Sequence, residues 1–275
     1  MQSEVRMYLS PSLSTRDLYL NACEEGDLEL ARVLLARGAD VNWRCAKGGL
    51  HYAARHDHGD LLDLLLAQPG LDVNIKDYRN ATPLMEACVR GSENSLRKLL
   101  QVDGIEINCQ NKSGRTALHL AFENDNPSCI KILGEASGLN WNLKDQMEWT
   151  PLLTAAVLGR ADSLEIILNV PQHQVDLTVI DNKGFNVAWC ALFNAMDNKE
   201  DEEEEYRGDR KRCVELLTAD PRVDWNFRDP EDGDTPLHFC LRNSEVKMAK
   251  TIIKNPSVDL NVQNIVGKFP ETIAR

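Results

Sequence analysis

The chain has 275 residues, of which 43% are apolar and 27% charged, so it holds enough apolar side chains for a folded core and is not disordered as a whole. Its 43 acidic residues outnumber 31 lysines and arginines, and the net charge of -12 argues against nucleic acid and anionic membranes as partners. No apolar run of about 18 residues and no secretory signal pattern occur. We therefore expect a cytoplasmic protein, with the nucleus as a second location, and no membrane association.

Residues 1–16 carry no repeated pattern and are predicted to form an N-terminal extension. Beyond them a phrase of the type TPLHxA returns every 34 residues and recurs near the C-terminus. Its copies are GGLHYAARHD from Gly48, TPLMEACVRG from Thr82, TALHLAFEND from Thr116, TPLLTAAVLG from Thr150 and TPLHFCLRNS from Thr235. A second phrase, of the type Asp-Val-Asn, recurs in phase with the first and ends at Asn42, Asn74, Asn108, Asn142, Asn226 and Asn261.

Two motifs held in phase at a period in the low thirties predict a stacked solenoid. The phrases at 116–121 and 235–239 resemble the Thr-Pro-Leu-His-x-Ala signature of ankyrin repeats, and the resemblance runs from about Asp17 to the C-terminus. It implies an all-α solenoid of helix-turn-helix units with short β-hairpin fingers. Residues 17–275 would then form about seven repeats, followed by a partial C-terminal cap.

The residues predict the same helices without the resemblance. Pro83, Pro151 and Pro236 suit the first turn of a helix, where no amide donor is needed, and the threonine before each can cap free N–H groups. Each second helix carries a leucine-rich stripe, as in LARVLL, LLDLLL, SLRKLL and SLEIIL. Such a stripe cannot bury itself alone, so each repeat must pack on its neighbours.

Repeat six departs from the pattern. It opens with NVAWCALF, and the insert NKEDEEEEYRGDRKR, residues 198–212, joins its two helices. This insert is predicted to be a mobile acidic loop at the end opposite the fingers, too charged to pack. Calcium binding by its acidic run is a weaker alternative, since the alternating oxygen ligands and turn glycine of a calcium loop are absent.

The histidines favour structure over chemistry. His51, His119 and His238 occupy the histidine of the signature, which in ankyrin repeats forms local hydrogen bonds that tie neighbouring repeats together. The run His56-Asp57-His58 offers ligand types for a transition metal. It falls in a turn where polar residues are expected, and no fourth ligand is spaced to join it, so we predict no metal.

Catalysis has no support in the sequence. The eight cysteines occur singly, which is typical of reduced intracellular thiols. Cys23, Cys88 and Cys240 fall in the alanine pair of their repeats, where a small apolar side chain suits a tight interface better than a nucleophile. No nucleophile elbow, phosphate-binding loop, zinc motif or kinase signature occurs. We predict a protein that is not an enzyme and needs no cofactor.

The finger asparagines suggest a modification. Ankyrin repeats are substrates of asparaginyl hydroxylases when the asparagine follows Asp or Glu and then Val or Ile, with a leucine eight residues upstream. Asn42, Asn74 and Asn108 match this pattern, and Asn142 does not. The alternative is that these asparagines only stabilise the finger turns.

Ankyrin proteins bind partners through fingers and first helices, so variable positions there are candidate contacts. Repeats five and six place apolar residues at them: Met147, Trp149, Val157, Leu158, Phe185 and Phe193. Repeats three and four place a tyrosine and basic residues there: Tyr78, Arg79, Arg90, Lys112 and Arg115. An exposed apolar patch is typical of an interface. The alternative is that Trp149 folds back on its own finger and repeat six is degenerate. Trp141 and Trp225 are predicted to be core.

These observations predict a monomeric protein-interaction module or adaptor that binds another protein through the concave face of the stack. The partner is expected to present an acidic segment with apolar anchors. One alternative is the targeting or regulatory segment of a larger enzyme or channel. A less favoured one is a chain whose main role is as an asparaginyl hydroxylase substrate.

Overall fold

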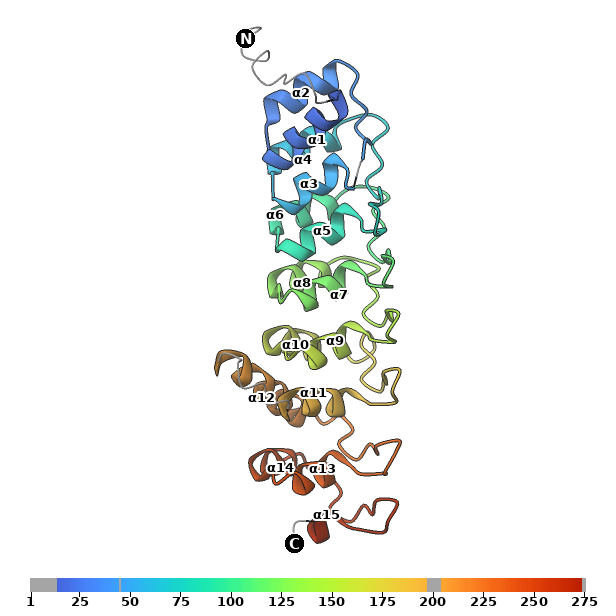
Figure 1. The fold of residues 1–275 in the computed structure, drawn as a ribbon, viewed down its shortest axis with the longest axis vertical. Coiled ribbons are helices and arrows are strands. Elements are labelled where there is room, and N and C mark those ends of the chain that lie inside the picture. The colour runs from blue at the N-terminus through green and yellow to red at the C-terminus, as the bar shows by residue number, and fades with distance from the viewer. Residues whose placement is uncertain (1–13, 45, 197–203, 274–275) are drawn as a thin grey trace. The chain divides into compact units, whose positions relative to one another are not determined.

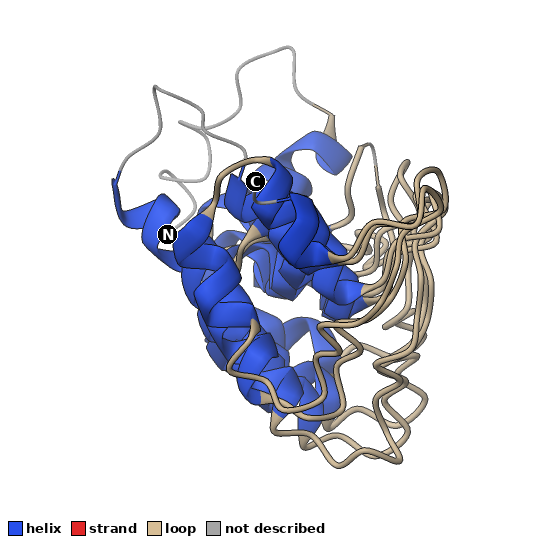
Figure 2. Ribbon diagram, turned by 90° about the horizontal axis from the view of Figure 1, so that it is seen from below, coloured by secondary structure: helices blue, strands red, loops and turns tan. Residues whose placement is uncertain are grey.

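A computed structural model of the chain describes residues 14–44, 46–196 and 204–273. The chain divides into two compact units, Met1–Leu139 and Asn140–Arg275, here called unit 1 and unit 2. In each unit, short helices follow one another in pairs, and long loops between the pairs extend to one side of the helices (Figures 1 and 2). Within the described ranges, no helix is long and apolar enough to span a membrane.

The described part of unit 1 contains four helix pairs. They are α1 (Thr15–Glu25) with α2 (Leu28–Ala36), α3 (Gly49–Arg55) with α4 (Gly59–Leu66), α5 (Pro83–Arg90) with α6 (Glu93–Leu100), and α7 (Ala117–Glu123) with α8 (Pro127–Gly134). The first helices α1, α3, α5 and α7 contact one another in order, and so do the second helices. The unit is therefore a stack with two helical layers, and the loops between pairs, the fingers, project from it.

Unit 2 continues the same plan in its described residues. Its helices are α9 (Pro151–Leu158), α10 (Ala161–Leu168), α11 (Val187–Met196), α12 (Glu204–Ala219), α13 (Pro236–Arg242), α14 (Val246–Ile252) and the short α15 (Pro270–Ile273). Helix α11 contacts α9 and α13, and α12 contacts α10 and α14. In both units we call the side formed by fingers and first helices the inner face.

The first helices begin where the Thr-Pro phrases predict. The side chain of Thr82 accepts a hydrogen bond from the N–H of Met85 (3.4 Å), and Thr150 does the same for Leu153 (3.4 Å). A proline occupies the first turn of α5, α9 and α13. Threonine caps and proline starts thus fix the register of each first helix.

The fingers are tight turns rather than β-hairpins. A repeated Asp or Asn organises them: Oδ1 of Asp77 accepts the N–H groups of Arg79 (2.7 Å) and Ala81 (2.8 Å). In the described residues the fingers contain two isolated antiparallel bridges and no strand. The Asp or Asn side chain accepts hydrogen bonds from backbone N–H groups that would otherwise pair with a neighbouring β-strand, so the finger does not need extended strands.

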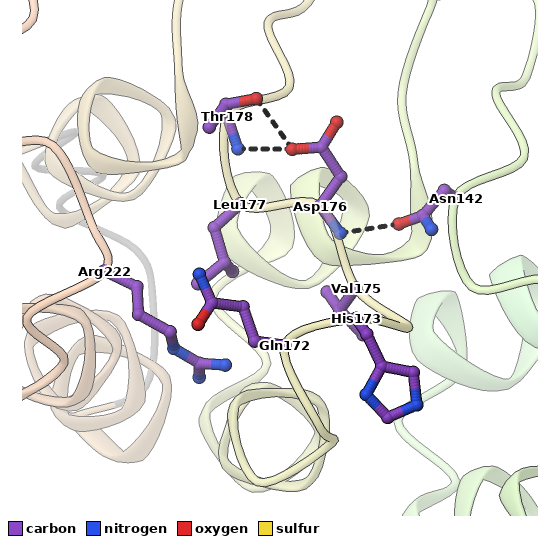
Figure 3. Close-up of a pocket in the computed structure, with 8 residues that line it drawn as sticks. All are labelled: Asn142, Gln172, His173, Val175, Asp176, Leu177, Thr178 and Arg222. Carbon is purple, nitrogen blue, oxygen red and sulfur yellow. Dashed lines mark hydrogen bonds between the residues drawn. The ribbon is translucent and has the colours of Figure 1, made fainter.

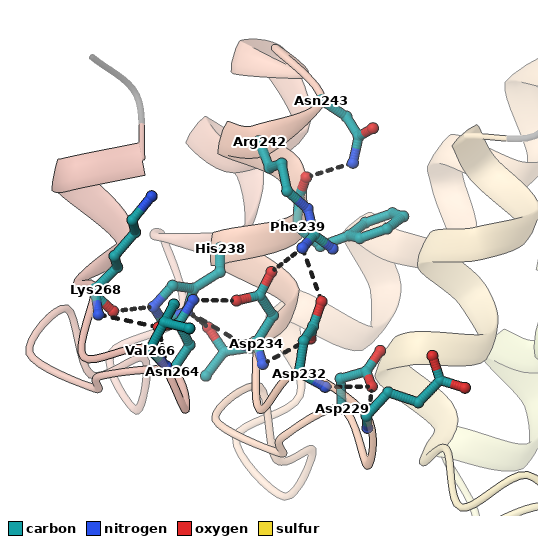
Figure 4. Close-up of polar contacts among 12 residues, drawn as sticks. Asp229, Asp232, Asp234, His238, Phe239, Arg242, Asn243, Asn264, Val266 and Lys268 are labelled. Carbon is teal, nitrogen blue, oxygen red and sulfur yellow. Dashed lines mark hydrogen bonds and ion pairs between the residues drawn. The ribbon is translucent and has the colours of Figure 1, made fainter.

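The signature histidines have the structural role that was predicted. Nδ1 of His51 accepts the N–H of Gly48 (3.1 Å), and its Nε2 donates to the carbonyl of Ala81 in the next finger (2.9 Å). His238 repeats this with Thr235 and with the carbonyl of Lys268 (3.0 Å; Figure 4). Burial lowers the pKa of His51, which favours the neutral ring that this pattern requires. His51 and His238 thus each hold their own helix start against the following finger.

Predicted core positions are buried. The leucine stripes of the second helices lie inside each unit, with Leu62, Leu96 and Leu164 fully covered. Cys23, Cys88 and Cys240 are buried as expected, and burial raises the pKa of both Cys23 and Cys240 to about 12. A thiol with such a pKa stays protonated at neutral pH and behaves as a small apolar group.

The insert of repeat six differs from its prediction. The loop expected over 198–212 is helical from Glu204 onward, because α12 begins there. Arg212 pairs with Glu165 of α10 (2.6 Å) and with Asp162, and Arg210 Nη1 donates to the carbonyl of Asn194. The basic end of the insert therefore packs, since acids on α10 compensate its charge. Residues 198–203 lie outside the described ranges.

Candidate interaction surface

Two aromatic side chains of unit 2 are placed on the inner face by the finger turns. Asp145 Oδ1 accepts the N–H of Trp149 (3.0 Å), and the Asp145 N–H donates to the Trp149 carbonyl (2.9 Å). Asp181 holds Phe185 through the same two contacts, both 2.9 Å. The backbone N–H and carbonyl of each aromatic residue are both hydrogen-bonded just before a first helix. The ring therefore lies next to that helix and is only partly exposed.

A pocket lies between these rings and the ends of the first helices. Its volume is about 570 Å³, and its apolar walls are Trp149 and Val157 of repeat five with Phe185, Cys190 and Phe193 of repeat six. The polar residues at its edge are Asp181, Lys183 and Asn194. Four residues predicted to form one apolar patch thus surround a single hollow, and all four are partly exposed.

The wall of this pocket is supported by an aromatic cluster. Phe185 and Phe193 pack edge to face with ring centroids 5.0 Å apart. The ring centroid of Phe193 lies 5.1 Å from that of Trp189 and 5.2 Å from that of Phe239. Trp189 is fully buried, and its Nε1 donates to the carbonyl of Phe227 (2.9 Å). Edge-to-face packing of this kind fixes ring positions, so the pocket is preformed.

Two members of the cluster were missed by the sequence prediction. Phe239 stands at the variable x of TPLHxA, as does Cys190, and this column was not among the predicted contact positions. Trp189 stands where the signature has histidine. It donates to a carbonyl of the following finger, as His51 and His238 do. Comparing the x column across repeats would have found Phe239, which packs on Phe193, and Cys190, which lines the pocket.

The remaining predicted apolar residues behave in two ways. Met147 and Leu158 are exposed, at 42% and 36%, but do not line the pocket. Trp141 and Trp225 are buried, as predicted for core residues. Trp149 is half-buried and lines the pocket, and its role as a partner contact stays a prediction.

The inner face of unit 1 contains a cluster of ion pairs. Glu86 of α5 is buried and bridges Lys47 Nζ (2.7 Å) and Arg55 Nη1 (2.7 Å) of the preceding repeat. Burial raises the pKa of Glu86, the hydrogen bonds from the two cations lower it, and the net result is a pKa below the usual value. One carboxylate thus holds two cations at this face.

The predicted basic residues of repeats three and four differ in their contacts: some are exposed, and one forms an ion pair. Arg79 stacks over the ring of Tyr78, with 5.1 Å from Cζ to the centroid. The N–H of Lys112 donates to the carbonyl of Arg79 (2.8 Å), which places the two finger tips side by side. Arg115 pairs with Glu123 (2.6 Å), so its charge is largely compensated. Arg90 is exposed at the end of α5.

The run from His56 to His58 is occupied by local contacts. Oδ1 of Asp57 accepts the N–H of Ser95 (2.7 Å), and His58 Nε2 donates to the carbonyl of Glu24 (3.0 Å). The two imidazole rings stack with centroids 5.7 Å apart. Asp57 and His58 therefore join their repeat to its neighbours on either side, which accounts for polar residues at this turn.

A second hollow in unit 2, of about 260 Å³, lies beside the turn 172–178 (Figure 3). Its polar groups hold the finger: Asn142 Oδ1 accepts the N–H of Asp176 (2.8 Å), and Asp176 accepts the hydroxyl of Thr178 (2.7 Å). Arg222 on its other side is bound by Asp220. We assign this hollow to packing between finger and helix ends.

The finger asparagines form a ladder. Asn42 Nδ2 donates to the carbonyl of Gly70 (2.8 Å) and its Oδ1 accepts the N–H of Asp72 (2.9 Å). Asn74 and Asn226 make the same pair of bonds to their next fingers, and Asn108 donates to the carbonyl of Gly138. Asn226 lies outside the set of predicted hydroxylation sites but is bonded identically. A structural role therefore accounts for the asparagine at all these positions.

Comparison with known proteins agrees with this architecture. Models of ankyrin repeats match residues 18–111, 84–181 and 232–265, which is more than half of the chain. The chain belongs to the ankyrin repeat family. Its repeats are the helix pairs described above, with a finger between each pair and the next.

Three relatives show how the match is distributed. XBAT32, an E3 ubiquitin-protein ligase of Arabidopsis thaliana, is 35% identical over 196 residues, which cover 59% of this chain and 38% of the ligase. The putative ankyrin repeat protein YahD of Escherichia coli is 30% identical over 170 residues, covering 60% and 84%. AVO2, a subunit of target of rapamycin complex 2 in Saccharomyces cerevisiae, is 30% identical over 181 residues, covering 64% and 41%. The match thus spans less than half of the ligase and of the complex subunit.

Proposed function

We propose that this ankyrin repeat chain is a protein-interaction module whose inner face holds a segment of another protein. The observation that carries the proposal is the pocket walled by Trp149, Val157, Phe185 and Phe193. Ankyrin repeats act by binding proteins, and a preformed hollow with aromatic walls is the kind of site in which a partner's apolar side chain becomes a binding hot spot. We propose that the module acts as a monomer, by binding rather than catalysis, in the cytoplasm or nucleus.

A second candidate function is the targeting segment of a larger assembly. The relatives named as a ubiquitin ligase and as a subunit of target of rapamycin complex 2 match this chain over only part of their length. In that case the same pocket would choose the substrate or the neighbouring subunit. The residues that bind are the same in both proposals, and the identity of the captured partner distinguishes them.

Affinity capture tests the proposal. The wild-type chain and the double variant Trp149→Ala/Phe185→Ala are used as baits in lysate of the source cells, with Val246→Ala as the control, because Val246 is exposed on the second helix α14. We expect at least one protein to be enriched by the wild type and the control and lost with the double variant. Identical captured sets would contradict a role for the pocket.

Hydroxylation of Asn42, Asn74 and Asn108 stays a prediction. Because these side chains bond to the next finger in the same way as Asn226, modification is not needed to explain them. Intact mass measurement of protein isolated from its source, followed by peptide mapping that locates each increment, checks it. Increments of 16 Da at these three asparagines would support the prediction, and their absence would leave only the structural role.

A further inference from the structure

The inner face of unit 1 carries an excess of cations on a protein that is strongly acidic as a whole. Its side chains come from the fingers and the first helices of three successive repeats. The cations are Lys47, Arg55, Arg79, Arg90, Lys112 and Arg115, with Arg44 and Lys76 in the same fingers; the acids are Glu86 and Glu123 on the helices and Asp40, Asp72, Asp77 and Glu106 in the fingers. The net charge of the chain is -12, so a basic face of this size must be balanced by acids elsewhere.

Internal pairing removes only part of this positive charge. Glu86 offsets one of the two cations Lys47 and Arg55, and Glu123 offsets Arg115. Arg79 and Arg90 are exposed; the guanidinium of Arg79 lies over the ring of Tyr78, and the Arg79 backbone N–H donates to Asp77 Oδ1 (2.7 Å). A surplus of positive charge therefore remains along α3 and α5.

The second helices of unit 1 are different. Three of their cations lie beside acids: Arg32 is 3.9 Å from Glu29, Lys98 is 2.6 Å from Asp63, and Arg97 is 3.5 Å from Glu135. Charge of both signs is interspersed there, as on an ordinary solvent-exposed surface. The positive surplus along α3 and α5 thus lies on the face that ankyrin repeats use for binding.

We propose that the inner face of unit 1 binds an acidic segment of a partner protein. This rests on the proposed function and adds the chemistry of the ligand at a surface other than the aromatic pocket. Complementary charge fixes the orientation and speeds the encounter of such a segment. Nucleic acid fits less well, because the acidic remainder of the chain repels a long polyanion.

The repeat spacing sets the expected pattern of acids. Packed helices lie about 8–10 Å apart, so successive cationic positions recur at that distance along the stack. A chain in the polyproline II conformation has three residues per turn and advances about 3.1 Å per residue, so every third side chain points to the same side, about 9 Å apart. Acidic side chains at every third residue would therefore meet positive groups of successive repeats, and Tyr78 offers an exposed ring, 52% accessible, at the finger tip.

The test is fluorescence anisotropy with the full chain and a labelled 12-residue peptide that has glutamate at every third position and glycine or serine between. Arg79→Glu/Arg90→Glu is compared with Arg32→Glu/Arg97→Glu, which makes the same charge change on exposed positions of the second helices. We expect the inner-face variant to weaken binding by about tenfold or more and the control by less than about twofold. Binding should also weaken as salt is added.

Two further arms make the outcome decisive. Glu123→Gln removes the partner of Arg115 without shortening the side chain, so it should strengthen peptide binding. Trp149→Ala/Phe185→Ala should leave peptide binding unchanged, which separates this surface from the pocket of unit 2. Equal loss in both charge-reversal variants, no binding of the peptide at low salt, or tighter binding of a 12-nucleotide single strand than of the peptide would overturn the proposal.

Discussion

Replacing Trp189 with alanine is expected to destabilise unit 2 by about 3–5 kcal/mol, the range typical of a large buried aromatic side chain. Trp189 is fully buried and contacts Phe185, Phe193 and Phe239 with ring centroids 5.1–5.7 Å apart. The variant would leave a cavity and also strip the Phe227 carbonyl of its donor, a loss of about 1–3 kcal/mol in itself. The cavity would lie at Trp189 in repeat six, and the lost hydrogen bond joins repeat six to the following finger.

Urea denaturation followed by far-ultraviolet circular dichroism measures this loss, and hydrogen exchange locates it in unit 2. Trp189→Phe keeps most of the ring and removes only the donor, so it should cost clearly less than the alanine variant. Trp149→Ala, at a partly exposed side chain, should cost less still. If Trp189→Ala unfolds no more easily than Trp149→Ala, the aromatic cluster does not stabilise the repeat.

Replacing Glu86 with alanine is expected to destabilise unit 1 by about 2–4 kcal/mol, because it leaves two partly buried cations without their shared carboxylate. Lys47 and Arg55 are 19% and 27% exposed and both contact the same Glu86 oxygen. The comparison variant is Glu123→Ala, whose pair with Arg115 is 35% and 25% exposed and is worth no more than about 1 kcal/mol.

The pH dependence checks the cause. The folded pKa of Glu86 lies below its usual value of 4.5, so its stabilising contribution is complete above that pH and is lost as pH falls through the folded pKa. The stability difference between wild type and Glu86→Ala should therefore be constant from pH 7 to pH 5 and shrink below about pH 4.5. A difference that does not change in acid would mean that the ion pairs are not its source.

The repeat period, the helix starts and the core were predictable because each has a local cause in the sequence. Thr82 and Thr150 cap helices through contacts three residues away, and the leucine stripes have a period that only a stack can bury. The same holds for His51, whose second hydrogen bond reaches the next finger at a distance set by the repeat. Because the repeats have a regular period, a pattern within one repeat also predicts which residues of the next repeat it contacts.

The details that escaped prediction depend on where a repeat breaks its pattern. Nothing local to Trp189 shows that an indole can replace the signature histidine as donor to the next finger. The helical end of the insert depends on Asp162 and Glu165, which lie 47 or more residues from Arg212. The pairing of Arg115 with Glu123 similarly joins a finger to a helix end. These contacts follow from the fold rather than from any motif.

The most direct test of the pocket as a protein-binding site is photo-crosslinking. A benzoylphenylalanine residue is introduced in place of Phe193, which lines the pocket, and in a second protein in place of Val246 on the outer helix α14. After irradiation in source cells, the probe at Phe193 should join to one partner protein, and adding Trp149→Ala to the same chain should abolish that product. If both probes give the same products, or the probe at Phe193 gives none, the pocket does not hold a partner.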